Sequence, residues 1–280
     1  MFLFSRKKQE KVPPTVQTIF IPPAGGEEQG MSFALANLQG IGNRQQQEDA
    51  FAFGNALDEK AIAQRGLLAV VADGMGGMEG GRVAGMTAVA EILKAFEQFE
   101  PEGDLPAQLN EAIWQANEAV YDKLGGYGGS TAVLGLVYQE KLYYSGVGDS
   151  YVFLLHDRVL TQLNERQTVL NRDLKDQIRE GRIDLEQARQ NPENHAVTQF
   201  LGMPDDPETD FLHSPLKLGP GDVILLCSDG VGGVLEPGCI EKCLCQGNPD
   251  EMCASLDLEI QNKKLKYQDN YTALIIQCRK

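Results

Sequence analysis

Short apolar runs, rich in β-branched residues and bounded by turn residues, recur along most of the chain. This pattern is typical of β-strands in a sheet that is buried on at least one face. Only Gln139 and Glu140 separate two of the runs, which predicts a hairpin at that point. The predicted strands are 31–38, 67–73, 130–138, 141–149, 151–155, 222–229 and 271–277.

Two longer segments show the 3.6-residue period of amphipathic helices, at 82–99 and 104–124. They follow each other between strands, so strands and helices do not alternate strictly. Grouped strands with helices set apart predict an α+β fold, with sheets packed together and helices outside. A polar stretch at 164–191, helical around 174–179 and 183–189, is interpreted as an insertion over the surface.

The first thirty residues differ from the rest. They contain four prolines and the segment AGGEEQG at 24–30, which predicts a flexible N-terminal arm over 1–30 and a single domain over 31–280. The apolar start, MFLF, is shorter than the roughly 7–15 residues of a secretory core or the about 20 of a membrane span. We therefore expect a cytoplasmic protein without a membrane span.

Composition narrows the function classes. The formal net charge is −15, which argues against nucleic-acid binding because phosphate backbones require clustered cations. Four of the six cysteines lie between 239 and 253, but their C-x3-C-x-C-x7-C spacing is not that of a zinc site. Cys239 and Cys243 are spaced to share one helix face as small apolar residues.

Aspartates stand beside several of the apolar runs. Each alone is ordinary turn chemistry, because Asp-Gly and Asp-Asn pairs are common in turns. Together they can converge at one sheet edge and offer the oxygen ligands that Mg²⁺ or Mn²⁺ prefers. The three histidines are far apart in sequence, which disfavours an imidazole site. The aspartates are Asp73, Asp149, Asp229 and Asp269, and the histidines are His156, His195 and His213.

A second polar cluster lies upstream. Arg44 precedes Glu48 and Asp49 by four and five residues. Neighbouring carboxylates on a strand point to opposite faces, so one can bind a metal and the other a water molecule. The planar guanidinium of Arg44 suits a phosphate group. A solvated charge cluster remains the alternative interpretation of these residues taken alone.

A larger set of motifs resembles the metal-dependent protein phosphatases of the 2C (PPM) family, including their bacterial serine/threonine phosphatases. The motifs occur in the family's order over about residues 31–277. They are RQQQEDA (44–50), VADGMGGMEGGRVAG (71–85), GGSTAVLGLV (128–137), YYSGVGDSYVFLL (143–155), LTQL (160–163), VTQFLG (197–202), ILLCSDGV (224–231) and DNYTALII (269–276).

The resemblance implies a four-layer α/β/β/α sandwich, two packed antiparallel sheets flanked by helices, with a binuclear Mg²⁺ or Mn²⁺ centre. It implies that Asp73 bridges the metals, that Glu48 and the Gly74 carbonyl complete one metal, and that Asp229 and Asp269 complete the other. The other implied roles are a metal-bound water for Asp49, substrate phosphate for Arg44, a third metal for Asp149 with Asp229, and a flap beside the site for residues 164–191.

The implied reaction is hydrolysis of phosphoserine and phosphothreonine in proteins by a metal-bridging hydroxide, without a phosphoenzyme. The expected partner is a phosphoprotein, with a Ser/Thr kinase opposing the enzyme. The chain has Met75 and Met78 where family members carry a histidine, so a metal-bound water is the first candidate for the general acid and His195 the second. Gln47, Arg82 and Gln199 also depart from the family pattern.

Three alternatives compete with this interpretation. LLAVVAD with GMGGMEGG resembles a dinucleotide-binding turn, but the glycine spacing is not G-x-G-x-x-G and Asp73 would repel a pyrophosphate. A phosphatase fold that has lost turnover and serves as a binding module is the second. A phosphatase of small phosphometabolites is the third.

Overall fold

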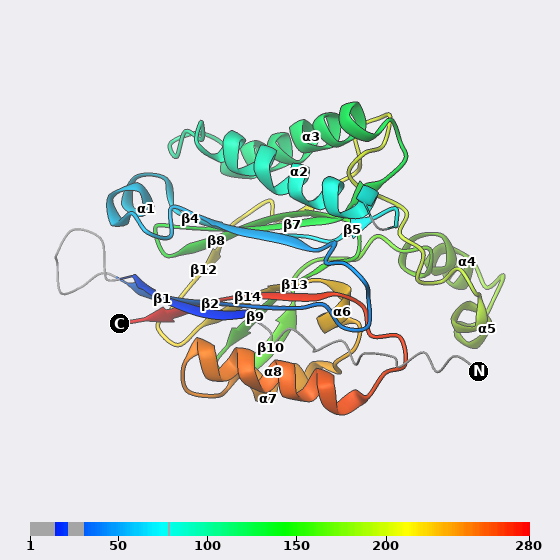
Figure 1. The fold of residues 1–280 in the computed structure, drawn as a ribbon. Coiled ribbons are helices and arrows are strands. Elements are labelled where there is room, and N and C mark those ends of the chain that lie inside the picture. Colours follow the sequence, from blue (N-terminus) through cyan, green and yellow to red (C-terminus); the bar gives the residue numbers. More distant parts are fainter. Residues whose placement is uncertain (1–14, 22–30, 78) are drawn as a thin grey trace, which may run out of the picture.

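Two antiparallel sheets pack face to face, and helices cover the outer face of each (Figure 1). This arrangement comes from a computed structural model, which describes residues 15–21, 31–77 and 79–280. Every strand pairing among these residues is antiparallel. The predicted α+β class and the α/β/β/α layering are confirmed.

The first sheet joins both ends of the described chain. Its strand order is β1-β2-β14-β13-β9-β10, so the last strand of the chain pairs with the early strand β2 on one side and with β13 on the other. The bounds are β1 Thr15–Ile21, β2 Ser32–Gly40, β9 Tyr151–His156, β10 Val159–Gln162, β13 Val223–Cys227 and β14 Tyr271–Arg279.

The second sheet has the order β11-β8-β7-β4-β3, and β12 also pairs with β8. A separate ribbon of β5 and β6 adjoins it. The bounds are β3 Ala50–Gly54, β4 Leu67–Ala72, β5 Gly74–Met75, β6 Gly129–Ser130, β7 Ala132–Tyr138, β8 Lys141–Val147, β11 Asp210–Phe211 and β12 Leu216–Lys217.

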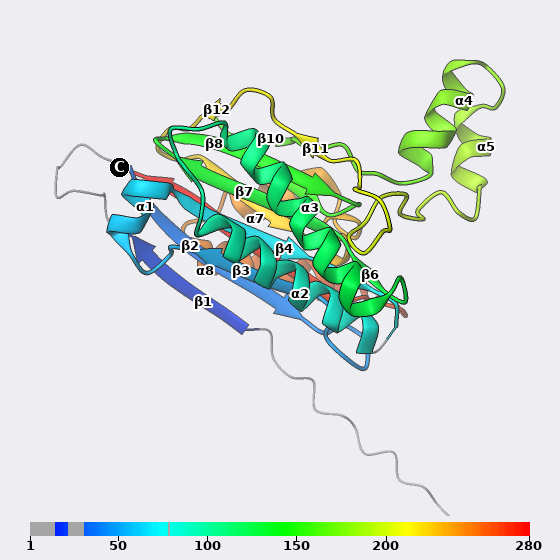
Figure 2. The ribbon, with the colours of Figure 1, turned by 90° about the horizontal axis from the view of Figure 1, so that it is seen from above.

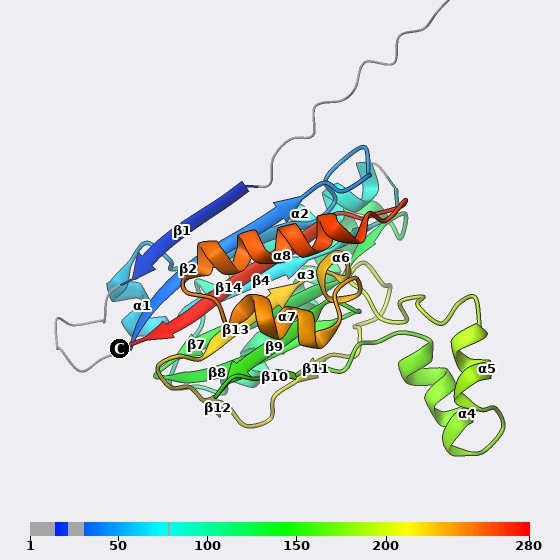
Figure 3. The ribbon, with the colours of Figure 1, turned by 90° about the horizontal axis from the view of Figure 1, so that it is seen from below.

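Helices α2 (Glu79–Phe96) and α3 (Leu105–Leu124) lie over the second sheet, as Figure 2 shows from above. Helices α7 (Pro237–Leu244) and α8 (Pro249–Lys263) lie under the first sheet (Figure 3). Local sequence sets both ends of α3. Asp104 caps its start by accepting from Ala107 N, and Gly125 ends the helix in the left-handed conformation. Two short helices are α1 (Glu59–Arg65) and α6 (Asp229–Gly232).

Three apolar layers fill the spaces between these elements. The middle layer lies between the sheets, and the outer two lie between each sheet and its helices. Strand β4 is buried on both faces because it contributes Leu68 and Val70 to one layer and Leu67 and Val71 to the next. A continuous apolar run such as LLAVVA is therefore what this position requires.

A projection at one end of the sandwich is built from the polar insertion. It contains a π-helix over Leu170–Leu174, α4 (Lys175–Arg179) and α5 (Leu185–Gln190). These helices stand away from the four layers at the end where β5 lies (Figures 1 and 2). The helical parts predicted within 164–191 are confirmed.

The hairpin predicted between 130–138 and 141–149 is also confirmed, as β7 and β8. Gln139 and Glu140 both have positive φ, as a two-residue hairpin turn requires. The predicted arm differs in part: residues 15–21 form β1 and pair with β2, which completes the sheet edge. The rest of the arm, residues 1–14 and 22–30, lies outside the described residues.

Candidate metal centre and catalytic pocket

Strand register brings the predicted carboxylates to one end of the sandwich. In the second sheet Ala50 pairs with Ala72, so Asp49, just before β3, and Asp73, just after β4, lie at the same edge. In the first sheet Cys227 pairs with Ala273, which places the segments that carry Asp229 and Asp269 at one edge too. Asp149 lies on the connection from β8 to β9, where the chain crosses between sheets.

These residues meet in a pocket of about 280 Å³. Its lining combines residues from both sheets with two from the segment that follows α5, His195 and Val197. The sequence thus predicted most of the lining, although the residues are up to 225 positions apart. The predicted site residues that line the pocket are Arg44, Glu48, Asp73, Gly74, Asp149, His195, Asp229 and Asp269.

Asp49 is the predicted residue that does not line the pocket. Its side chain is only 6% exposed and lies behind the opening. Ser228 Oγ donates to Asp49 Oδ2 at 2.9 Å, whereas the buried Oδ1 accepts no hydrogen bond from any residue that the structure describes. Asp49 is therefore held by one oxygen and has its second oxygen available.

Two residues that the sequence analysis did not assign to the site hold its backbone. Asn270 donates to the carbonyls of Ile41 and Gln46 and accepts from the Glu48 amide at 2.8 Å, so it fixes the loop that carries Arg44 and Glu48. Thr131 Oγ1 accepts from the Asp73 amide at 3.1 Å. In the sequence, the signal for the role of Asn270 was its position next to Asp269, but an Asp-Asn pair is equally typical of a turn.

Burial, followed by the crowding of like charges, dominates the electrostatics of the carboxylates. Burial, and then the Asp229 charge, raises the pKa of Asp149 to about 7, and burial raises the pKa of Asp49 to about 7. Burial and the charges of Asp49 and Asp229 hold the pKa of Asp73 well above its usual range. Burial and then Asp269 raise the pKa of Asp229. A set of carboxylates in this state favours protons or cations.

Arg44 lies at the mouth of the pocket. Its Nη2 donates to Asp269 Oδ2, and this contact raises the pKa of the guanidinium. With more than half of its side chain exposed, Arg44 keeps further donors at the opening. Within 15–21, 31–77 and 79–280, no group of three or more His, Cys, Asp or Glu side chains stands ready to hold a metal ion. To coordinate a cation, the carboxylate side chains of the pocket would therefore have to move closer to one another.

The donor set nevertheless fits hard divalent cations. It consists of carboxylates and backbone carbonyls. Within the described part of the chain, Asp229 Oδ1 is buried and accepts no hydrogen bond. A buried carboxylate oxygen without a partner is costly unless a ligand or an ion satisfies it. The residues of the pocket therefore suit Mg²⁺ or Mn²⁺.

Close backbone packing also shapes the site and gives a first prediction. A Cβ added at Gly81 in α2 would lie 2.1 Å from Glu48 Oε2 and 2.9 Å from the Gly74 carbonyl oxygen. Because the Glu48 carboxylate can swing away, Gly81→Ala is expected to displace it and weaken Mn²⁺ binding by about ten-fold or more. Calorimetric titration with Mn²⁺ measures this change.

The matched control for this prediction is Gly238→Ala in α7. Its Cβ would meet nothing within 4 Å, so metal affinity should not change. Stability should increase by about 0.5–1 kcal/mol because alanine favours a helix over glycine. Equal Mn²⁺ affinity in Gly81→Ala and the unmodified protein would contradict the assigned position of Glu48.

The sequence profile of protein phosphatase 2C matches residues 40–256. The chain belongs to the protein phosphatase 2C family. It is therefore a metal-dependent protein phosphatase, a hydrolase of phosphoric monoesters. The match covers the residues that line the pocket apart from Asp269 and Asn270, which lie beyond its end.

Relatives of this phosphatase support the same assignment. The serine/threonine phosphatase stp of Listeria monocytogenes is 29% identical over 186 residues, which cover 63% of this chain and 71% of that protein. The Mycobacterium tuberculosis serine/threonine phosphatase PstP/Ppp is 26% identical in a crystal structure that covers 89% of this chain and 99% of its own, with a TM-score of 0.71.

The catalytic domain of PstP has also been solved in complex with two manganese ions. That structure is 25% identical to this phosphatase, covers 89% of this chain and 100% of its own, and has a TM-score of 0.69. Within the described part of the phosphatase, no helix has the length and apolar character needed to cross a membrane.

Proposed function

We propose that this phosphatase removes phosphate from phosphoserine and phosphothreonine in a protein substrate at the carboxylate pocket. The observation that carries the proposal is the convergence of Asp73, Asp229 and Asp269 from two sheets beside the exposed Arg44. Residues 31–280 act as a single phosphatase domain, with 164–191 as the flap beside the pocket.

In this proposal one end of the sandwich would hold Mg²⁺ or Mn²⁺. Asp73, Glu48 and the Gly74 carbonyl would hold one ion, and Asp73, Asp229 and Asp269 would hold the other. Asp149 with Asp229 would hold a third. When bound, such ions lower the pKa of water towards about 7 and stabilise charge on phosphoryl oxygens.

The remaining residues position the reactants. One N–H of the Arg44 guanidinium donates to Asp269, and its other N–H groups bind two oxygens of the substrate phosphate. Asp49 orients the attacking water through Oδ1, because Ser228 already occupies Oδ2. Ser228 is thus a positioning residue and not a nucleophile, which agrees with hydrolysis without a phosphoenzyme.

Release of phosphate from p-nitrophenyl phosphate and from a phosphothreonine peptide tests the proposal. We expect turnover with Mn²⁺ or Mg²⁺ and none after chelation. Folded protein that is inactive with both ions would support the binding-module alternative. A far higher kcat/KM for phosphometabolites than for phosphopeptides would support the metabolite alternative.

His195 carries a separate prediction, as the imidazole that lines the catalytic pocket. We propose that it protonates the leaving alkoxide, which no lining methionine can do. His195→Gln should then lower kcat on a phosphothreonine peptide by about 10²-fold but change p-nitrophenyl phosphate turnover little, since nitrophenolate leaves without a proton. Steady-state rates on the two substrates measure the contrast.

The control is His156→Gln, because this histidine, at the end of β9, lies outside the pocket lining. Equal losses on both substrates in His195→Gln would exclude the acid role and leave bound water as the donor.

A Ser/Thr kinase that opposes the enzyme, and a cytoplasmic location, are further parts of the proposal. Phosphoproteomics of cells that lack the gene and cell fractionation test them.

A further inference from the structure

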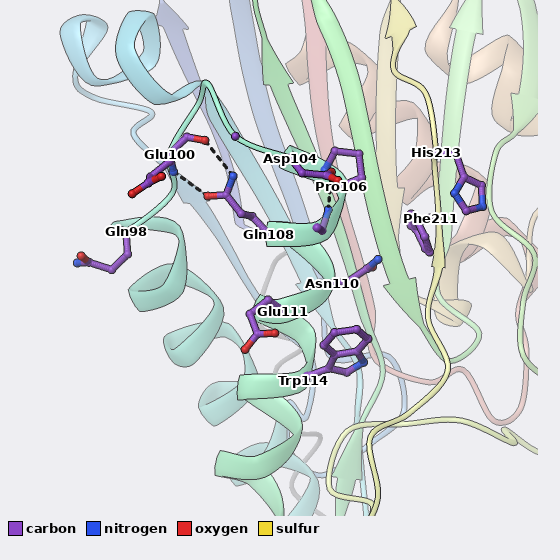
Figure 4. Close-up of a pocket in the computed structure, with 12 residues that line it drawn as sticks. Gln98, Glu100, Asp104, Pro106, Gln108, Asn110, Glu111, Trp114, Phe211 and His213 are labelled. Carbon is purple, nitrogen blue, oxygen red and sulfur yellow. Dashed lines mark hydrogen bonds between the residues drawn. The ribbon is translucent and has the colours of Figure 1, made fainter.

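A second and larger cavity lies away from the catalytic pocket. Its volume is about 760 Å³, and it is bounded by the loop before α3, by the first half of α3, and by the segment from β11 towards β12 (Figure 4). The mechanism above uses none of its lining residues.

Aromatic rings form part of this cavity. Trp114, the single tryptophan of the chain, is partly buried in α3, and its Nε1 donates to the Pro207 carbonyl at 3.2 Å. Across from it the rings of Phe211 and His213 lie 4.4 Å apart at their centroids. Faces of aromatic rings attract cations and the flat guanidinium group.

Carboxylates also line this cavity. Glu100, Asp104 and Glu111 are exposed and line the cavity, and no lysine or arginine is among its lining residues. Asp104 also caps α3, while among the described residues Glu111 accepts only from the Gln115 amide, at 3.2 Å. In a chain of net charge −15, the cavity therefore has a negative field that attracts cations.

A buried amide points to what else the occupant must offer. Asn110 is 5% exposed, and its Oδ1 accepts from Ser145 Oγ at 2.5 Å. Among the hydrogen bonds of the described residues, none is donated by its Nδ2. Figure 4 shows this side chain extending from α3 towards Phe211 with its nitrogen at the tip. A donor that lines the cavity and has no protein partner among the described residues suits an acceptor such as a peptide carbonyl.

We propose that this cavity docks a basic peptide segment of the phosphoprotein substrate, an inference that rests on the proposed function. An arginine or lysine side chain of the segment lies against Trp114 with Glu111 as its counter-ion. Asn110 Nδ2 donates to a backbone carbonyl of the segment. The cavity is thus a docking site that selects substrates by positive charge at a distance from the phosphorylated residue.

The chain itself connects this docking site to the catalytic pocket. Val197 lines the pocket, and Phe211, farther along the same segment, lines the cavity. Between them, Glu208 accepts from Arg172 of the insertion, and Pro207 accepts from Trp114. A polypeptide that follows this segment reaches both sites.

Trp114 fluorescence tests the docking directly, since the chain has one tryptophan. The full-length protein is titrated with a short peptide that contains two arginines, and with the same peptide carrying glutamine in their place. We expect a saturable change with the arginine peptide, at least five-fold weaker binding for Glu111→Gln, and unchanged binding for the control Glu118→Gln. Glu118 is also exposed on α3 but lies outside the cavity lining.

Two results would overturn the proposal. One is the absence of any saturable response, or equal responses to both peptides. The other is a fluorescence change without peptide when Arg6, Lys7 and Lys8 are replaced by glutamine in the full chain, because it would make the chain's own basic segment the occupant. Binding needs no turnover, so p-nitrophenyl phosphate hydrolysis in the same samples reports separately on the proposed function.

A linked substrate then tests the role of docking in catalysis. A phosphothreonine peptide that carries two arginines beyond a flexible Gly-Ser linker should have a KM at least five-fold lower than its glutamine counterpart. The difference should disappear in Glu111→Gln and persist in Glu118→Gln, while kcat stays the same. An equal KM for both peptides would remove the cavity from substrate selection.

Discussion

Asp73→Asn is expected to lower kcat on p-nitrophenyl phosphate by at least about 10³-fold, because several kcal/mol of metal-derived stabilisation depend on this side chain. The change keeps the shape of the side chain and removes one charge. Asp229→Asn should have a comparable effect, since both residues line the pocket and interact with each other. Rates measured at saturating Mn²⁺ test both variants.

The two variants should remain folded. Removing a negative charge from a cluster in which burial and neighbouring carboxylates raise the pKa of Asp73 relieves repulsion, so the metal-free melting temperature should increase. Asp122→Asn, at an exposed position of α3, is the control and should change neither rate nor melting. A near-native rate in Asp73→Asn would remove this residue from the metal centre.

The metal-free protein is expected to lose stability as the pH rises from 5 to 8. Asp49 and Asp149 have pKa values of about 7 in the folded protein, above the ordinary 3.8. The folded state therefore binds more protons than the unfolded state between about pH 4 and pH 7, and its advantage declines across that window. One such group accounts for roughly 3 kcal/mol between pH 5 and pH 8, or roughly 5–10 °C in melting temperature.

Melting curves in the presence of a chelator measure this effect, and Mn²⁺ added at pH 8 should reverse it. Asp149→Asn should flatten the pH dependence. His156 acts in the same direction, because its hydrogen bond to Asp222 raises its pKa and the resulting stability is lost as the pH increases. His156→Gln is therefore the necessary control. A melting temperature that increases with pH in the chelated protein would contradict the assigned charge cluster.

Much of the sandwich could be predicted because local patterns and tertiary position agree. The runs at 67–73 and 271–277 are apolar because β4 and β14 are buried on both faces. Elements with weaker periodicity were missed, including β3, α1, α7 and α8. For α8 a signal was present in the sequence: Asn248 and Glu251 form a capping box, and Pro249 starts the helix.

The site was predictable as a set of residue types but not as a set of contacts. The contact between Arg44 and Asp269 joins the two ends of the domain, and no local pattern reports it. The role of Asn270 depends on three backbone partners from the 41–48 segment.

The cysteine cluster is explained by helix packing: Cys243 and Cys253 are buried between α7, α8 and the first sheet.

The division of the carboxylates between two sheets has a mechanical consequence. Asp49 and Asp73 belong to one sheet edge, and Asp229 and Asp269 to the other, so ions held by residues of both edges would link the two sheets. Any slippage of one sheet over the other would separate these residues and release the ions. Conversely, bound ions would hold the sheets in register, so metal affinity measures how firmly the halves of the sandwich are joined.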